Sequence, residues 1–119
     1  MKYLLLIYSN EADWANVSEA EQDKIFGEYM EFSRAIYKSG HYLAGEALQP
    51  IATATTVRSR GGKPLATDGP FAETREQLGG FYMIEAKDLD EAIAIGARIP
   101  TARTGCIEVR PIMETPPVT

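Results

Sequence analysis

Two segments of the chain are apolar on both alternating sets of positions: Lys2–Tyr8 (KYLLLIY) and Gly80–Ala86 (GFYMIEA). Successive side chains of a β-strand point to opposite faces of its sheet, so a strand with water on one side alternates apolar and polar residues. Neither segment alternates in this way. The pattern therefore predicts two central strands that are buried on both faces, in a sheet that needs cover on each side.

A long amphipathic helix is predicted between these strands. Ser18 and Glu21 form a capping-box pattern at its start, and Gly40 suits the position just after its last residue, near Ser39. Apolar residues recur at spacings of four, three and four, which gives one stripe that packs on the core. The stripe contains Ile25, Tyr29, Phe32 and Ile36, widened by Phe26, Met30 and Tyr37.

A second helix is predicted over Leu89–Ile99. Asp88 and Glu91 repeat the capping-box pattern at its start, and Pro100 ends it. The residues that this helix is expected to bury are Leu89, Ala92, Ile93 and Gly96.

Four further strands complete the predicted elements. They are Tyr42–Gln49, the hairpin strands Thr53–Arg60 and Lys63–Thr67 around Gly61-Gly62, and Thr104–Ile112. Arg58 and Arg60 share one face of the hairpin and could be aimed at an anion. The order of elements is that of a ferredoxin-like α+β fold, in which right-handed crossovers put both helices on one face of an antiparallel sheet.

That arrangement leaves the other face of the sheet open, although both central strands are apolar there as well. Several apolar side chains on an open face would form a larger exposed patch than a soluble monomer usually has. A second copy of the sheet is the simplest cover, because a standard interface buries enough apolar surface to be stable. We therefore expect a homodimer that packs sheet to sheet.

The stretch Thr67–Gly80 (TDGPFAETREQLGG) concentrates charge beside a stiff turn. Asp68-Gly69-Pro70 is turn chemistry, and Gly79-Gly80 indicates a bulge or a close backbone approach. On the pattern alone, an ordinary charged surface loop is the favoured explanation of the stretch. A stiff loop would nevertheless hold its charges in fixed positions, which favours a site. The charged residues are Asp68, Glu73, Arg75 and Glu76.

The segment DGPFAETREQLGGFYMIEA resembles the YCII-related family, specifically the branch named for its Asp-Gly-Pro-Phe motif. MKYLLLIY, GEALQP, TATTVR, DLDEAIAIGARIPTARTG and IEVRPIME extend the resemblance over almost the whole chain. It implies a ferredoxin-like subunit that dimerises through its sheet into a dimeric α/β barrel, with a largely unassigned activity. It also implies a cavity, since related dimeric barrels perform isomerase and dehalogenase-like chemistry on small carboxylated rings. Members of this branch are often encoded beside extracytoplasmic-function sigma factors, which suggests such a factor as a partner.

Composition narrows the function classes. The 119 residues fit one domain, over 1–115, with a loose tail at 116–119. A net charge of −5 without a basic stripe argues against binding to nucleic acid. The single Cys106 cannot form an internal disulfide, no Cys/His cluster indicates a metal site, and no cofactor is expected. The first apolar run is too short for a signal peptide or a membrane span, so a cytoplasmic location is expected.

The candidate site consists of polar residues that would reach the interior of the dimer, where they need partners. Three of them lie on predicted strands, namely Glu46, Glu108 and Arg110. The charged residues of the Thr67–Gly80 stretch would fold over the mouth of the barrel. A carboxylate cluster in a half-buried cavity has raised pKa values, so one member could act as a general acid or base.

The roles expected in such a site follow from residue type. Asp68 would handle the proton, with Glu46 or Glu73 as its neighbour. Arg75 or Arg110 would anchor a substrate carboxylate, and Glu76 and Glu108 would complete the ligand contacts. A purely structural ion-pair network with Arg75 and Arg110 remains an equal alternative.

His41, the only histidine, follows the end of the first helix and is predicted to be dispensable. The other YCII branch carries a histidine early in that helix, proposed to act with an aspartate, and this chain has none between Ser18 and Gly40. Two functions remain open: a small-molecule enzyme or binding protein, and a non-catalytic accessory or regulatory module.

Overall fold

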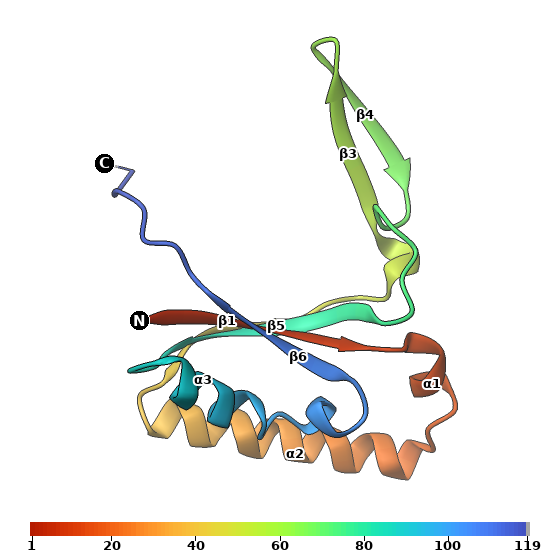
Figure 1. Cartoon of the computed structure of the whole chain (residues 1–119). Coiled ribbons are helices and arrows are strands. Elements are labelled where there is room, and N and C mark those ends of the chain that lie inside the picture. The colour runs from red at the N-terminus through yellow and green to blue at the C-terminus, as the bar shows by residue number, and fades with distance from the viewer. Residues whose placement is uncertain (119) are drawn as a thin grey trace.

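A four-stranded antiparallel sheet forms the middle layer of the computed structural model, which describes residues 1–118 (Figure 1). Its strand order is β2-β5-β1-β6. The central strands are β1 (Lys2–Ser9) and β5 (Gln77–Glu85), and the edge strands are β2 (Tyr42–Ala47) and β6 (Cys106–Pro111). Both segments predicted to be central strands are therefore central. The predicted α+β, ferredoxin-like class is confirmed, and within residues 1–118 the sheet stays open instead of closing into a barrel.

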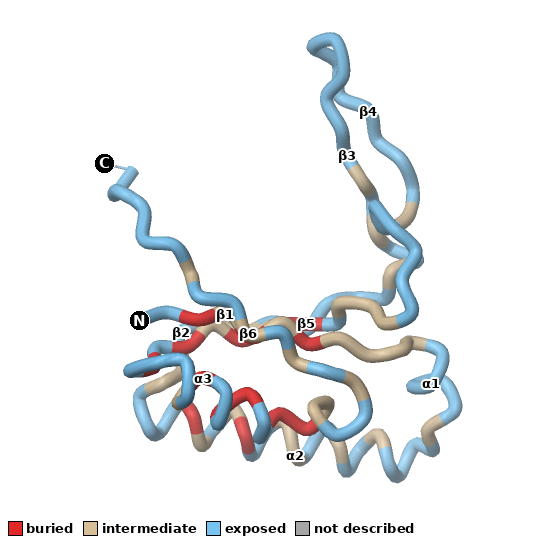
Figure 2. The backbone as a smooth tube through the Cα atoms, viewed as in Figure 1, coloured by how far each residue is buried: buried red, intermediate tan, exposed pale blue. Residues whose placement is uncertain are grey.

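The helices α2 (Glu19–Lys38) and α3 (Leu89–Gly96) cover the same face of this sheet (Figure 1). The core lies between the two layers, and Figure 2 colours the buried residues of the strands and helices red. The sheet contributes alternate residues of its central strands, because alternate side chains share a face. The core residues are Tyr3, Leu5, Ile7, Phe32, Ile36, Tyr82, Ile84, Ala86, Ala92, Ile95 and Ile99.

Helix α2 begins and ends as predicted. The Ser18 hydroxyl accepts a hydrogen bond from the backbone N–H of Glu21, and Gly40 follows the helix with a φ of 83°. Phe32 and Ile36 are buried, but the predicted widening of the stripe is wrong. The two buried residues form a narrow stripe, and the Tyr37 ring only borders the core, with its centroid 5.9 Å from that of Tyr42 in β2. Phe26, Met30 and Tyr37 are exposed.

Helix α3 is shorter than predicted and buries two of the four residues that were expected to be buried. Leu89 and Ile93 are about half exposed, whereas Ala92 and Gly96 are buried. The reason is close packing on the sheet: a Cβ at Gly96 would lie 3.6 Å from the side chain of Ile107. Small residues let α3 approach β6, and larger side chains would hold it away. The four-residue η2 turn (Pro100–Arg103) then leads to β6.

No sequence pattern predicts the short helix α1 (Glu11–Ala15), which directly follows β1. The Asn10 side chain caps it by accepting a hydrogen bond from the N–H of Ala12. Trp14 in α1 makes an edge-to-face contact with Phe26, with ring centroids 5.7 Å apart. This contact gives Phe26 an aromatic neighbour outside the core.

The strands β3 (Thr55–Arg60) and β4 (Lys63–Asp68) form a separate hairpin, joined to β2 through the η1 turn (Ile51–Thr53). The predicted two-residue loop is confirmed: Gly61 and Gly62 have φ values of 58° and 76°, as a type I′ turn requires. The hairpin stands up from the sheet on the side opposite the helices, and the C-terminal segment rises on that side too (Figure 1). Thr119, the end of the predicted tail, lies outside the described residues.

One bidentate ion pair ties α2 to η2 on the helical side. Arg103 donates from Nη1 and Nη2 to the two carboxylate oxygens of Glu28, at 2.8 and 2.9 Å. These hydrogen bonds from Arg103 lower the pKa of the Glu28 carboxyl. A carboxyl whose pKa is lower in the folded state adds stability above its unfolded-state pKa and loses it as the pH falls through the folded-state value.

Replacing Glu28 by Gln should therefore lower the melting temperature at neutral pH and have little effect in acid. Thermal unfolding of both proteins from neutral pH to about pH 2 tests this expectation, since the wild-type carboxyl is protonated at the acidic end. The difference between the two melting temperatures should shrink continuously on the acidic side of the normal glutamate range. A constant difference over the whole series would show that the ion pair is not its cause.

Candidate functional site

The sheet face opposite the helices has an apolar centre. Strand register brings Leu4 beside Met83 and Leu6 beside Phe81, so these four side chains lie on one face of β1 and β5. Their neighbours Tyr3, Leu5, Tyr82 and Ile84 point to the helices and are buried. The four are only half-buried in the protomer. We call Leu4, Leu6, Phe81 and Met83 the open face.

A polar row on β6 borders the open face. Glu108 lies opposite Leu6, and Arg110 lies opposite Leu4. The Tyr8 hydroxyl donates to Oε1 of Glu108 at 3.2 Å, and Nη1 of Arg110 lies 3.7 Å from Oε2 of the same carboxylate. Desolvation, followed by the hydrogen bond to Glu108, raises the pKa of Tyr8. Tyr8 is thus a neutral hydrogen-bond donor beside one anion and one cation.

Glu76 connects the Thr67–Gly80 stretch to this row. Its Oε1 lies 3.7 Å from Sγ of Cys106, the first residue of β6. Desolvation and the neighbouring Glu76 carboxylate raise the pKa of the Cys106 thiol. Cys106 is therefore a protonated thiol at neutral pH, without the thiolate character of a reactive cysteine.

Glu46 lies at the opposite edge of the same face. A row of directly paired residues crosses the sheet from Glu46 through Phe81 and Leu6 to Glu108. Three inter-strand spacings separate the two carboxylates, or roughly 14 Å. The structure therefore does not bring Glu46 and Glu108 together, and the apolar centre of the open face lies between them.

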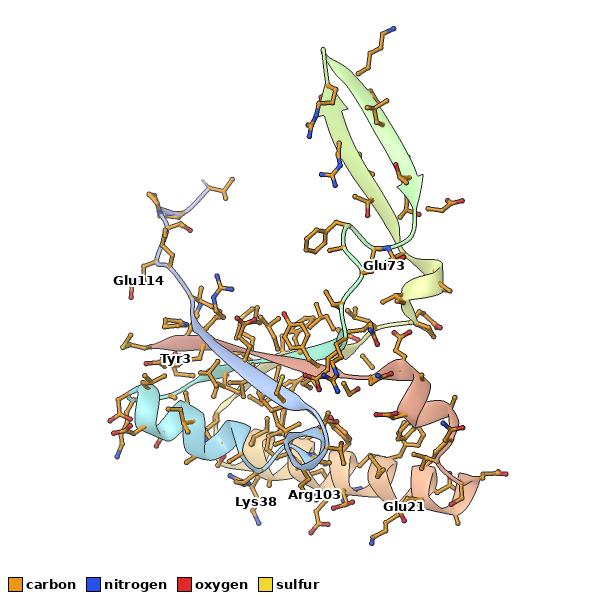
Figure 3. The ribbon with its side chains drawn as sticks, turned by 45° about the vertical axis from the view of Figure 1, so that its right-hand side comes forward. Tyr3, Glu21, Lys38, Glu73, Arg103 and Glu114 are labelled. Atoms are coloured by element: carbon orange, nitrogen blue, oxygen red, sulfur yellow. The ribbon has the colours of Figure 1, made fainter. Side chains whose placement is uncertain are left out.

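Asp68, Glu73 and Arg75 do not join the polar row in the protomer. All three are exposed, and Figure 3 shows Glu73 at the base of the upright hairpin. Among residues 1–118, the Asp68 side chain makes no hydrogen bond or ion pair, so in the protomer it does not join an ion-pair network with Arg75 or Arg110. The turn is held instead by the N–H of Gly69, which donates to the carbonyl of Ala54 at 2.7 Å.

The segment between β4 and β5 is fixed by its neutral residues. The Thr74 hydroxyl donates to the backbone carbonyl of Glu76, and Nε2 of Gln77 donates to the carbonyl of Thr74 at 2.7 Å. The Gln77 side chain also accepts from the N–H of Glu11, next to β1. These bonds hold Glu76 beside the sheet and leave Glu73 and Arg75 facing solvent.

The sequence matches the YCII-related domain over residues 1–116. It is also 35% identical over 114 residues to an uncharacterized protein of Rhizobium meliloti (strain 1021), a match that covers 94% of this chain and 92% of that protein. The chain belongs to the YCII-related family. Membership of the branch with the Asp-Gly-Pro-Phe motif is compatible with these matches and stays a prediction.

The single histidine of this YCII-related chain lies away from the open face. Nδ1 of His41 is 2.6 Å from the Ser39 hydroxyl, and Nε2 is 3.3 Å from Oε1 of Glu91 in α3. Its surroundings are the C-terminal end of α2 and the start of α3. The contacts fit a role in joining two helix ends, and the prediction that His41 is dispensable stands untested.

Sequence reasoning missed Tyr8 as a site residue of this YCII-related fold. The alternation that placed Leu4 and Leu6 on one face puts Tyr8 on that face as well, so the signal was present in β1. Its contact with Glu108 depends on the pairing of β1 with β6, which the sequence does not fix.

No group of three or more potential metal ligands gathers among the described residues, 1–118. Over the same residues, no helix combines the length and apolar character needed to cross a membrane.

Proposed function

We propose that this YCII-related protein is a homodimer that binds a small carboxylated molecule with an apolar body over the open face. The observation that carries the proposal is a row of polar side chains along one border of an apolar surface: Glu108 and Arg110 on β6, with Tyr8 of β1 hydrogen-bonded to Glu108. Ligand sites are mostly apolar, with a few polar groups that orient the ligand. This surface has that composition.

The homodimer follows from the need to cover the open face. The helices occupy the other side of the sheet, and the β3–β4 hairpin stands upright instead of folding over the face (Figure 1). Phe71, in the segment that runs down from the hairpin, is 79% exposed. A second sheet packed on this side would bury the open face and Phe71. A standard stable interface buries about 800 Å² per partner. A small molecule would then bind between the two sheets.

A carboxylate is the ligand group that Arg110 best suits. A guanidinium has five N–H donors, and the long 3.7 Å contact with Glu108 leaves most of them free. The neighbouring Leu4 supplies apolar contact for the body of the ligand. The Tyr8 hydroxyl, whose raised pKa keeps its proton, can donate a further hydrogen bond.

A catalytic role would require more than ligand binding, namely a group that transfers a proton. Of the seven residues expected in the site, Glu108 and Arg110 lie on β6, and the Glu76 carboxylate lies beside Cys106 at the start of that strand. Glu108 is the carboxylate that contacts both a hydroxyl donor and a cation. The acid–base role expected of Asp68 and the regulatory role beside a sigma factor both stay predictions. The polar row therefore supports binding, with Glu108 as the candidate for any proton transfer.

The test is a comparison of Arg110→Met with Arg34→Met, which removes an exposed cation from α2 instead. Both variants and the wild type are titrated with a panel of aliphatic and aromatic carboxylates that includes benzoate, with benzamide as the uncharged analogue. Wild type and Arg34→Met should bind a carboxylate and reject its amide. Arg110→Met should bind at least about tenfold more weakly, the expected loss for a charge-assisted hydrogen bond. Equal affinity in both variants, or no carboxylate bound by the wild type, would contradict the proposal.

A further inference from the structure

The β3–β4 hairpin, residues 55–68, is an arm with one cationic face. Strand register pairs Arg58 with Leu65 and Arg60 with Lys63, and paired residues share a face. All three cations of the arm therefore lie on the same side of it. Asp68 is the only carboxylate in residues 55–68 and belongs to the opposite face, where it pairs with Thr55.

The arm makes few packing contacts with the rest of its own protomer. Every residue of the arm is exposed except Thr56, whose hydroxyl donates to the carbonyl of Gly69 at 2.8 Å. Val57 and Leu65, its larger apolar residues, are 65% and 50% exposed. A two-stranded hairpin without a packed face is at best marginally stable in water. The arm therefore needs a surface outside its own protomer.

The arm projects away from its own sheet and does not cover it (Figure 1). The radius of gyration of the chain is 16.5 Å, compared with about 13.5 Å for a compact domain of this length. Six residues per strand reach roughly 20 Å, whereas two packed sheets lie only about 10 Å apart. If a second copy covers the open face, the tip of each arm must pass beyond the sheet of the partner and lie beside it.

Charge makes a second copy a suitable surface for the tip. The arm carries three cations and one carboxylate, a net +2, while the whole chain carries −5, so the rest of the chain carries −7. At the sheet edges Glu46 is exposed on β2, and Glu108 is exposed on β6. The cations of an arm would thus approach an acidic body.

We propose that each arm binds a second copy of the chain. Arg58, Arg60 and Lys63 of the arm would form ion pairs with carboxylates at the sheet edge of the partner. This inference rests on the proposed homodimer and adds the contact that orients its two sheets. The arms of the two copies would exchange reciprocally, as a two-fold axis requires. A bound molecule would then be enclosed at each end by an arm and its descending segment.

The first test reverses charge on the arm. Arg58→Glu/Arg60→Glu is compared with Lys24→Glu/Arg34→Glu, which changes the net charge equally at exposed positions of α2. At low salt, sedimentation should show a dimer dissociation constant at least about tenfold higher for the arm variant than for the α2 variant. The ratio of the two dissociation constants should fall at high salt, where charge pairs are screened. Equal constants for the two variants would overturn the inference and leave the sheet-to-sheet dimer standing, whereas a monomeric wild type would overturn both.

The second test locates the arm directly. Unlabelled and isotope-labelled wild-type chains are mixed, equilibrated and treated with a carbodiimide, which joins a lysine amine to a carboxylate that contacts it. Lys63 should appear in mixed-isotope peptides, linked to a carboxylate of the other copy, and Lys63→Arg should remove these links while keeping the charge. Links from Lys63 confined to single chains would overturn the inference.

Discussion

Replacing Leu6 by glutamate should convert the protein from a dimer to a folded monomer. Leu6 lies at the centre of the open face, between Phe81 and Glu108, and its side chain points away from the helical core. A charge buried in an interface without a partner costs about 3–5 kcal/mol, and Glu108 beside it adds repulsion. The dimer dissociation constant should therefore rise by roughly a thousandfold.

The matched control is Ala20→Glu, which adds the same charge at an exposed position in the first turn of α2. Sedimentation gives the mass of each variant, and circular dichroism confirms that both are folded. Ala20→Glu should remain dimeric with the wild-type constant. A Leu6→Glu protein that is folded and still dimeric at wild-type strength would place the interface elsewhere.

Gly105→Ala should strongly destabilise the fold, although the change adds only one methyl group. A Cβ at Gly105 would overlap the carbonyl oxygen of Tyr8 and lie 3.1 Å from Cα of Ser9. Backbone atoms of β1 cannot move aside without breaking the pairing of Tyr8 with Cys106. Overpacking typically costs about 1–3 kcal/mol, and a clash with backbone belongs at the upper end of that range or beyond it.

Gly27→Ala is the matched control for this prediction. A Cβ at Gly27, in the middle of α2, would meet no described atom within 4 Å beyond its two chain neighbours and the backbone of its own helix turns. Alanine is favoured over glycine in a helix interior by about 1 kcal/mol. Urea unfolding should therefore show opposite signs for the two substitutions. Two equal shifts of the same sign would contradict the packing of β6 on β1.

Local patterns were enough to predict most of the secondary structure. The Ser18 capping box and Gly40 bound α2, and the Gly61-Gly62 pair makes the hairpin turn, because each signal acts through adjacent residues. The open face could be predicted as well. Alternation alone assigns Leu4 and Leu6 to the side opposite Tyr3 and Leu5, before any packing is known.

Contacts between distant segments could not be predicted in this way. The sequence places Asp68 and Glu76 in one charged stretch, but the upright hairpin leaves Asp68 exposed, and the descending segment carries Glu76 to Cys106. Glu46 and Glu108 share a face but lie at opposite edges, which only the strand order decides. The exposure of Leu89 and Ile93 in α3 could not be predicted for the same reason. The close approach of Gly96 to β6, a contact between distant segments, determines which residues of α3 are buried.

The central claim is that a second copy covers the open face formed by Leu4, Leu6, Phe81 and Met83. Sedimentation equilibrium of the wild-type protein at micromolar concentration tests it most directly. The expected result is a single species with twice the 13.1 kDa mass of the chain. A species with the mass of one chain under these conditions would contradict the sheet-to-sheet dimer and the ligand site between its sheets.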